Sequence, residues 1–159
     1  MFRLKLRKAK LSDCDFLLQL RNEARVRQNS LFTDLVKRKE HKDWFLRSLN
    51  NSQRLILVAE FEKKLAGMVR FDRQEFKNEC EISIAVSELF LGHNLGWQIL
   101  SLGIEFLRSD MKDCCGLIAR VKDNNVSSHR LFQAYGFNIF DQQVGSGGAV
   151  TVIYRHSLQ

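Results

Sequence analysis

Apolar and polar residues alternate at the start of the chain and in several later segments. Phe2, Leu4 and Leu6 alternate with basic residues, which predicts a first strand with one buried face. Glu62 and Lys63 lie in a short turn between two apolar runs, so those runs predict a hairpin. Including the hairpin, later strands are predicted at 55–59, 65–71, 81–86, 117–121, 138–143 and 150–155.

Other stretches show the spacing of an amphipathic helix. Ser12 and Asp15 mark a helix start, and apolar residues at 16, 17 and 20 continue it. Over 37–49, His41, Trp44 and Phe45 fall on one helical face. Two further helices are predicted, at 94–108 and after Asn125.

The order of these elements predicts a single α/β domain over residues 1–159, with a mixed sheet of about seven strands flanked by about four helices. The chain has no proline, and neither a repeat nor a linker is visible. The glycine-rich segment 145–148 predicts the loop of a hairpin between the last two strands.

Composition limits the class of protein and its partners. With 45% hydrophobic and 27% charged residues, the chain is typical of a folded domain. The net charge of +7 favours an acidic ligand. Because the basic residues are scattered and form no nucleic-acid module, we expect no nucleic-acid partner. The oligomeric state is left open, with a homodimer as one alternative.

Cysteines and hydropathy exclude further classes. Cys14, Cys80, Cys114 and Cys115 have neither a Cys-x-x-Cys pair nor histidines at zinc spacing, so no metal site is expected. No apolar run reaches the roughly 20 residues that span a bilayer, and the N-terminus lacks a signal-peptide core. We therefore expect a cytoplasmic protein without a membrane partner.

The strand at 81–86 runs through a glycine-containing turn into the helix at 94–108. Backbone N–H groups at a helix N-terminus are unpaired and carry the positive end of the helix dipole, so this turn predicts a site for a pyrophosphate-bearing ligand. The residues expected to bind it are Ala85, Val86, Leu91, Gly92, His93, Asn94, Leu95 and Gly96.

A second segment, 125–137, predicts a capped amphipathic helix that ends at Gly-Phe. Together the two segments resemble the GCN5-related N-acetyltransferase (GNAT) superfamily. Its turn reads Gln/Arg-x-x-Gly-x-Gly/Ala, and its second helix reads Asn-x-x-Ala/Ser-x-x-Leu-Tyr-x-x-x-Gly-Phe. The matching residues are Val86, Gly96, Asn125, Ser128, Leu131, Gly136 and Phe137.

Two positions of the turn depart from the family pattern. Leu91 stands where a basic residue is usual, which leaves the phosphates held mainly by backbone. Asn94 replaces the middle glycine, and asparagine tolerates the left-handed backbone conformation better than most residues.

The resemblance implies acetyl transfer from acetyl-CoA to an amine. It places the oxyanion donors at backbone N–H groups near Ala85 and Val86, on a strand that splays from its neighbour. The amine must lose a proton, and Glu81 is the first candidate for this base. His41 is the alternative, although a buried, hydrogen-bonded histidine explains it equally well.

The departing thiolate benefits from an acid, and the family often uses a tyrosine where this chain has Phe132. Tyr135 is the expected replacement, with Ser128 as a weaker one. The resemblance also places Asn125, Ser128 and Phe132 at the cofactor. The loss of the usual tyrosine leaves open a CoA-binding module without catalysis.

The acceptor is predicted from the N-terminal half and from Arg120. Ribosomal-protein N-acetyltransferases carry a carboxylate where Arg120 stands, so an acidic acceptor is favoured over a ribosomal or other protein N-terminus, which remains the alternative. The first half contains Arg21-Asn22, Val26-Arg27, Ser30, His41-x-x-Trp44-Phe45 and Val69-Arg70-Phe71-Asp72. In these residues it is similar to acetyltransferases of nucleotide-linked amino sugars in the pseudaminic acid pathway. That resemblance implies that Arg21, Asn22 and Arg27 contact the sugar or its phosphates, since a guanidinium matches phosphate oxygens.

Overall fold

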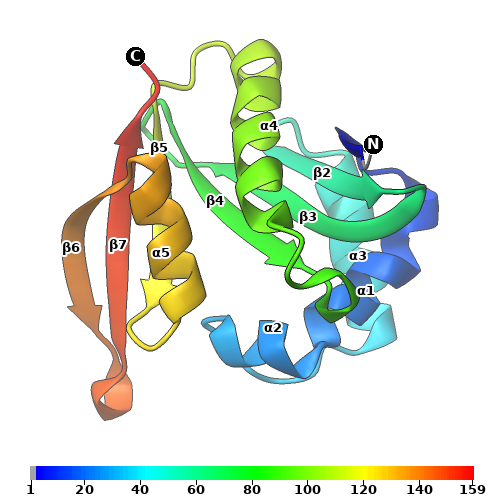
Figure 1. Cartoon of the computed structure of the whole chain (residues 1–159), viewed down its shortest axis with the longest axis horizontal. Coiled ribbons are helices and arrows are strands. Elements are labelled where there is room, and N and C mark those ends of the chain that lie inside the picture. Colours follow the sequence, from blue (N-terminus) through cyan, green and yellow to red (C-terminus); the bar gives the residue numbers. More distant parts are fainter. Residues whose placement is uncertain (1–2) are drawn as a thin grey trace.

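The computed structural model describes residues 3–159 and contains one mixed sheet with strand order β1-β2-β3-β4-β5-β7-β6 (Figure 1). The predicted α/β fold is confirmed. The strands are β1 (Leu4–Lys8), β2 (Arg54–Phe61), β3 (Lys64–Arg73), β4 (Glu79–Val86), β5 (Gly116–Lys122), β6 (Asn138–Val144) and β7 (Val150–Ser157).

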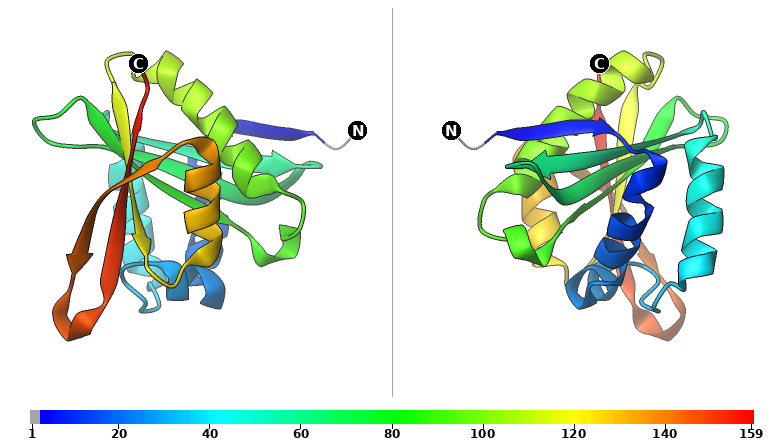
Figure 2. Two further views of the ribbon diagram at one scale, coloured as in Figure 1. Left: turned by 60° about the vertical axis from the view of Figure 1, so that its left-hand side comes forward. Right: turned by 90° about the vertical axis from the view of Figure 1, so that its right-hand side faces the viewer.

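Helices cover both faces of the sheet (Figure 2). They are α1 (Cys14–Asn22), α2 (Ala24–Asn29), α3 (Arg38–Leu49), α4 (Leu95–Asp110) and α5 (Val126–Tyr135), with short 3-10 turns at Leu11–Asp13, Glu88–Phe90 and Ser146–Gly148. Where one N-terminal helix was predicted before position 37, the structure has α1 and α2, because Glu23 has an extended ψ of 133°.

Strand β2 is buried on both sides because each face packs against helices. Ile56 and Val58 contact Leu17 of α1 and Phe45 of α3. The alternate residues of β2, with Leu57 at their centre, join the larger core formed with α4. This explains why 55–59 is a continuous apolar run without alternation.

The first strand pairs antiparallel with β2 and buries Leu4, as the alternating pattern predicts. Phe2, which belongs to the same predicted pattern, lies outside the described residues. At the other edge, β6 and β7 form the predicted hairpin around the glycine-rich segment.

The pairing of β4 changes along its length. On one side it pairs with β3 as far as Val86. On the other side its parallel pairing with β5 covers only Glu79, Cys80 and Glu81. Beyond Glu81 the two strands separate, so the sheet opens at the end of β4 that leads into the glycine turn (Figure 1).

Candidate active site

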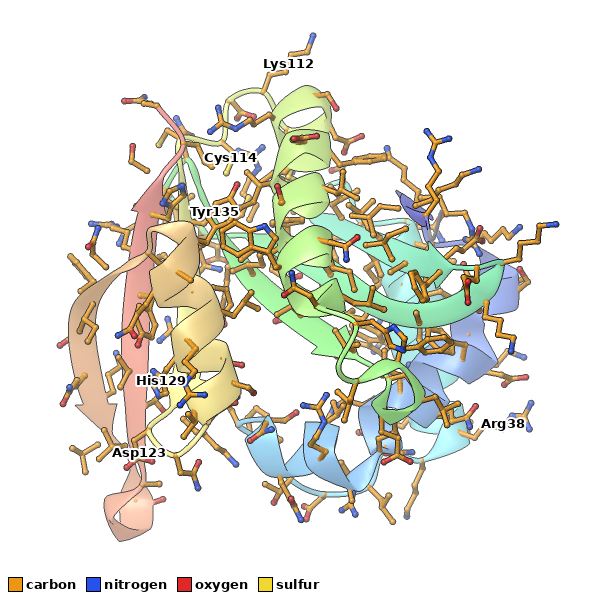
Figure 3. The ribbon with its side chains drawn as sticks, in the orientation of Figure 1. Arg38, Lys112, Cys114, Asp123, His129 and Tyr135 are labelled. Atoms are coloured by element: carbon orange, nitrogen blue, oxygen red, sulfur yellow. The ribbon has the colours of Figure 1, made fainter. Side chains whose placement is uncertain are left out.

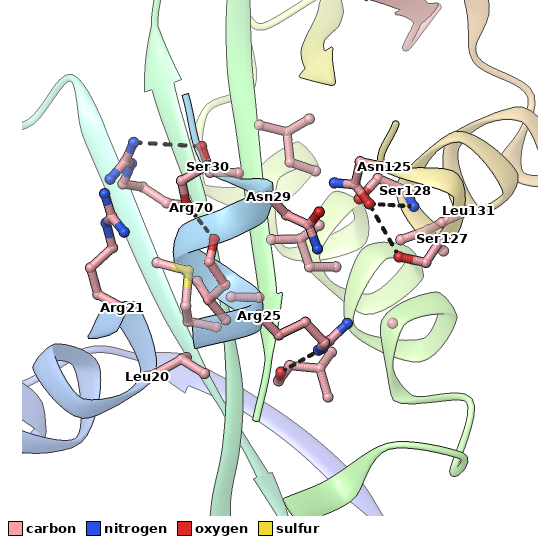
Figure 4. Close-up of a pocket in the computed structure, with 18 of the residues that line it drawn as sticks. Leu20, Arg21, Arg25, Asn29, Ser30, Arg70, Asn125, Ser127, Ser128 and Leu131 are labelled. Carbon is pink, nitrogen blue, oxygen red and sulfur yellow. Dashed lines mark hydrogen bonds between the residues drawn. The ribbon is translucent and has the colours of Figure 1, made fainter. Parts of the chain in front are cut away.

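A cavity of about 1080 Å³ occupies the opening between β4 and β5. Its wall includes β4 from Glu81 to Val86, the turn that enters α4, and one side of α5. On the other side it is bounded by α1, α2 and α3. Figure 4 shows polar side chains facing this cavity from both directions, with Arg21 and Arg25 from the N-terminal helices and Ser127 and Ser128 from α5.

The unpaired edge of β4 is the first functional feature of the cavity. Ser83 to Val86 lie beyond the last β5 pair but line the cavity. A strand edge without a partner offers backbone donors and acceptors to a ligand that lies along it. The predicted splay near Ala85 and Val86 is therefore present.

The glycine turn has the backbone conformation of an anion cradle. Gly92 has φ +83°, and Asn94 is left-handed at φ 54° and ψ 31°. No side chain caps the N-terminus of α4. Because the first N–H groups of the 16-residue helix α4 are left for a ligand, the turn fits the pyrophosphate of a CoA molecule.

Most of the predicted turn residues line the cavity. Leu91, Gly92, Asn94, Leu95 and Gly96 belong to its wall. The wall does not include His93, whose exposed ring lies 5.5 Å from that of Phe61. Leu95 is buried in the core, so its side chain supports the turn.

Helix α5 presents its N-terminus to the same space. The Asn125 side chain caps it by accepting from Ser128 N at 3.3 Å and from Ser127 Oγ at 3.2 Å. His129 fixes the helix to the sheet through Tyr154 Oη at 2.6 Å and the Lys122 carbonyl at 2.9 Å. Asn125, Ser128 and Phe132, all predicted at the cofactor, line the cavity.

Glu81 lies where the two strands separate. Its carboxylate accepts a hydrogen bond from Arg120 Nε at 3.3 Å, and both side chains line the cavity. Glu79, two residues earlier, instead pairs with Arg155 at 2.7 Å and is not part of the cavity wall. The geometry thus separates two carboxylates that share one strand face.

His41 lines the cavity but is 4% exposed. Its Nδ1 lies 3.6 Å from Cys14 Sγ, and its ring stacks on Phe45. Burial lowers the pKa of His41, and the charge of Asp15 opposes this effect. The imidazole is therefore held neutral near pH 7 by its packing, as the buried interpretation expects.

Tyr135, which Figure 3 labels on α5, is not among the residues that line the cavity. Its ring packs 5.3 Å from that of Trp97 and edge-on to His156. This position does not support the predicted acid role, because the ring packs between Trp97 and side chains outside the cavity lining. Phe132 fills the inward position and packs on Phe137.

The three residues predicted to bind substrate differ in their surroundings. The side-chain amide of Asn22 makes two hydrogen bonds to the backbone of Val36. It donates to the carbonyl and accepts from the N–H, each at 2.9 Å. Arg27 donates to the Thr33 carbonyl. Neither lines the cavity, so their observed role is to hold the loop between α2 and α3; Arg21 alone reaches the cavity.

Several cavity residues were not predicted as site residues, although Trp44 and Arg70 are among those on which the amino-sugar resemblance rests. Arg25 lines it from α2 and donates to the Val86 carbonyl at 3.1 Å. Trp44 and Arg70 line it from α3 and β3, and the Arg70 guanidinium lies 5.5 Å from the Trp44 ring. Two features of the sequence point to them. Arg25 follows the predicted Arg21 and Asn22 closely in the chain, and Trp44 lies on the apolar face of its predicted helix.

Helix α2 bridges the two separated strands. Glu23, where α1 ends, accepts from Ser87 Oγ at 2.9 Å and from Glu88 N at 3.0 Å. At the other end, Lys122 Nζ donates to the Gln28 carbonyl at 2.9 Å. These hydrogen bonds join α2, which bounds the cavity, to the ends of both β4 and β5.

The fold and this site agree with the comparison to known families. The model of the acetyltransferase (GNAT) family matches residues 17–137. The chain belongs to this family. It is an acetyltransferase, and its acetyl donor is acetyl-CoA. A search of curated proteins returned no match.

Solved structures show the same fold across nearly the whole chain. Spermidine N-acetyltransferase from Vibrio cholerae, in complex with CoA and spermine, has a TM-score of 0.87 at 14% identity, covering 97% of this chain and 95% of that one. A putative acetyltransferase from Salmonella typhimurium, with its cofactor acetyl-CoA, has 0.81 at 22%, covering 99% and 95%. Ribosomal-protein-alanine N-acetyltransferase from Brucella melitensis has 0.81 at 26%, covering 97% and 99%.

Across residues 3–159, no group of three or more His, Cys, Asp or Glu side chains is arranged to hold a metal ion. In the same part of the chain, none of the helices combines the length and apolar character that crossing a membrane requires.

Proposed function

We propose that this acetyltransferase modifies a primary amine of a small acidic acceptor, and that a nucleotide-linked amino sugar is the best specific candidate. The observation that carries the proposal is the continuity of the cavity. It runs from the cradle at Gly92 and Gly96, along β4, to the arginine-lined space beside Trp44. A donor and an acceptor can therefore meet at the open edge of β4.

At the cofactor end of the cavity, backbone groups make the contacts to acetyl-CoA. When bound, acetyl-CoA supplies the acetyl group as a thioester. The N–H groups at the start of α4 hold its pyrophosphate, and the free edge of β4 aligns its pantetheine arm. Backbone N–H near Ala85 and Val86 donates to the carbonyl oxygen as negative charge develops there.

Glu81 removes the proton of the acceptor amine, directly or through one water. It is the carboxylate that lines the cavity on β4, at the point where β4 leaves β5. Arg120 Nε donates to its carboxylate at 3.3 Å, which orients the side chain at the opening of the sheet. His41 is a weaker candidate, since its ring is held by Cys14 and Phe45.

The end of the cavity beside Trp44, where the acceptor is proposed to bind, is positively charged, and this favours an acidic acceptor. Arg21, Arg47 and Arg70 line it, whereas the acidic side chains among the described residues that line the cavity are Glu40 and Glu81. A polycationic amine such as spermidine would meet like charges there. The resemblance of the N-terminal half to nucleotide-amino-sugar acetyltransferases supports the more specific candidate.

The experiment is acetyl transfer with pooled acceptors. The purified chain is incubated with acetyl-CoA and either nucleotide-linked amino sugars, peptides or polyamines, and free thiol release is followed. We expect release with the sugar pool. Release with the peptide or polyamine pool alone would overturn the proposed acceptor while leaving the acetyltransferase in place.

A further inference from the structure

Arg21 carries a buried donor that no described group accepts. Its Nη2 donates to the Phe32 carbonyl at 2.7 Å, which fixes the guanidinium at the cavity wall. Its Nη1 is buried and has no hydrogen-bond partner. An unpaired buried donor of a charged group costs free energy, so its presence here indicates a ligand atom that accepts from it.

Arg70 adds a second, incompletely neutralised guanidinium. Its Nε donates to Asp72 at 2.7 Å, but the same carboxylate also pairs with Arg54. One carboxylate thus serves two arginines, and a net positive charge remains. A second hydrogen bond of Arg70 is a long one, 3.5 Å from Nη2 to Ser83 Oγ.

The two guanidinium groups lie at the same end of the cavity (Figure 4). The pKa of Arg21 is lowered, first by burial and then by the positive charges of Arg70 and Arg27. Repulsion between like charges is tolerated where an anion binds between them.

We infer that Arg21 and Arg70 form an anion-binding subsite that receives a phosphate or carboxylate group of the acceptor. This inference rests on the proposed function and assigns the acidic part of the acceptor to defined atoms. Arg21 donates through Nη1, and Arg70 through the nitrogen that now reaches Ser83. The amine of the same acceptor then extends along β4 toward Glu81.

The subsite is tested by titrating the full chain with inorganic pyrophosphate, and separately with succinate, by calorimetry. Saturating CoA is present throughout, so that the cradle at α4 does not bind the probe. We expect at least one of the two anions to bind. Arg21→Gln and Arg70→Gln should each weaken that binding about tenfold or more, as the loss of a charge-assisted hydrogen bond predicts.

Arg27→Gln is the matched control, because Arg27 holds the same loop as Arg21 through the Thr33 carbonyl but lies outside the cavity wall. Because only its charge acts on Arg21, it should weaken anion binding much less than Arg21→Gln does. Thermal unfolding of each variant identifies any loss of fold. If loop loosening explained the effect, Arg27→Gln would weaken binding as much as Arg21→Gln, and the inference would be wrong.

The outcomes separate this inference from the proposed function. Absence of binding by both anions, or binding that Arg21→Gln and Arg70→Gln leave unchanged, overturns the subsite even if acetyl transfer to sugars is observed. Arginine-dependent anion binding without any transfer to the sugar pool supports the subsite and removes the proposed acceptor. A preference for pyrophosphate over succinate identifies phosphate as the group received.

Discussion

Arg120 Nε donates to Glu81 Oε2 at 3.3 Å, and Glu81 belongs to the last residue pair that joins β4 to β5, Glu81 with Ile118. The ion pair therefore spans the point where the sheet opens. In the ribosomal-protein branch a carboxylate is expected at the place of Arg120, so here the carboxylate comes from the neighbouring strand instead. In the proposed mechanism, removal of the amine proton at the opening then depends on Glu81.

Glu81→Gln should lower turnover by about a hundredfold or more, the usual contribution of a positioned general base. The amide keeps the shape of the side chain but does not accept a proton at neutral pH. CoA binding should be unchanged, because the cradle lies at the other end of β4. Steady-state kinetics and CoA titration measure the two effects separately.

Glu79→Gln is the control for this variant. Glu79 lies on the same strand face, but it pairs with Arg155 and does not line the cavity. We expect lower stability with turnover close to wild type. Equal turnover of Glu81→Gln and the wild type would remove Glu81 from the role of base.

The β2–β3 hairpin predicts a stabilising pair of substitutions. Glu62 and Lys63 both have positive φ, 51° and 65°, although neither residue type favours this region. Asn-Gly is the preferred sequence for such a turn. Glu62→Asn with Lys63→Gly should raise the free energy of unfolding by about 1 kcal/mol, measured by urea denaturation.

The pH dependence of stability should change when His41 is replaced. Burial lowers the pKa of His41 in the folded state, so below about pH 6.5 the unfolded chain binds more protons than the folded one. This contribution to stability is complete above that pH and is lost as the pH falls through the folded pKa. His41→Gln should therefore lose less stability on acidification.

Urea titrations between pH 5 and about pH 7.5 test this expectation. Cys14 and Asp15 remain in both proteins, so the difference between the two curves reports His41. Parallel curves for the wild type and His41→Gln would show that the buried imidazole does not titrate in this range on unfolding.

The strands and the glycine turn could be predicted from the sequence because their signals are local. The apolar run around Leu57 and the left-handed tolerance of Asn94 are properties of a few neighbouring residues. The break at Glu23 has no local signal. Its carboxylate holds Ser87 and Glu88, more than sixty positions away in the chain.

The acceptor residues were harder to predict for a related reason. A pattern identifies an arginine but not what its guanidinium contacts. Arg27 and Asn22 hold backbone groups of their own loop, whereas Arg70, on a distant strand, joins Arg21 in the cavity. Which basic residue is left for a ligand depends on partners that the fold brings together.

Gly96 offers a substitution that should separate stability from cofactor binding. It lies in the first turn of α4 and lines the cavity. A Cβ at this position would lie 3.6 Å from a Leu131 methyl group, an ordinary contact, so the protein itself tolerates alanine. The space that the Cβ would occupy borders the proposed pyrophosphate cradle.

Gly96→Ala should therefore raise the melting temperature slightly while it weakens CoA binding. Alanine in a helix is favoured over glycine by about 0.5–1 kcal/mol. In the cradle the methyl group keeps the phosphates from the backbone N–H groups, and we expect CoA affinity to fall about tenfold or more. Thermal unfolding and CoA calorimetry on the same preparation measure both. If Gly96→Ala binds CoA as tightly as the wild type, the pyrophosphate does not lie against this turn of α4.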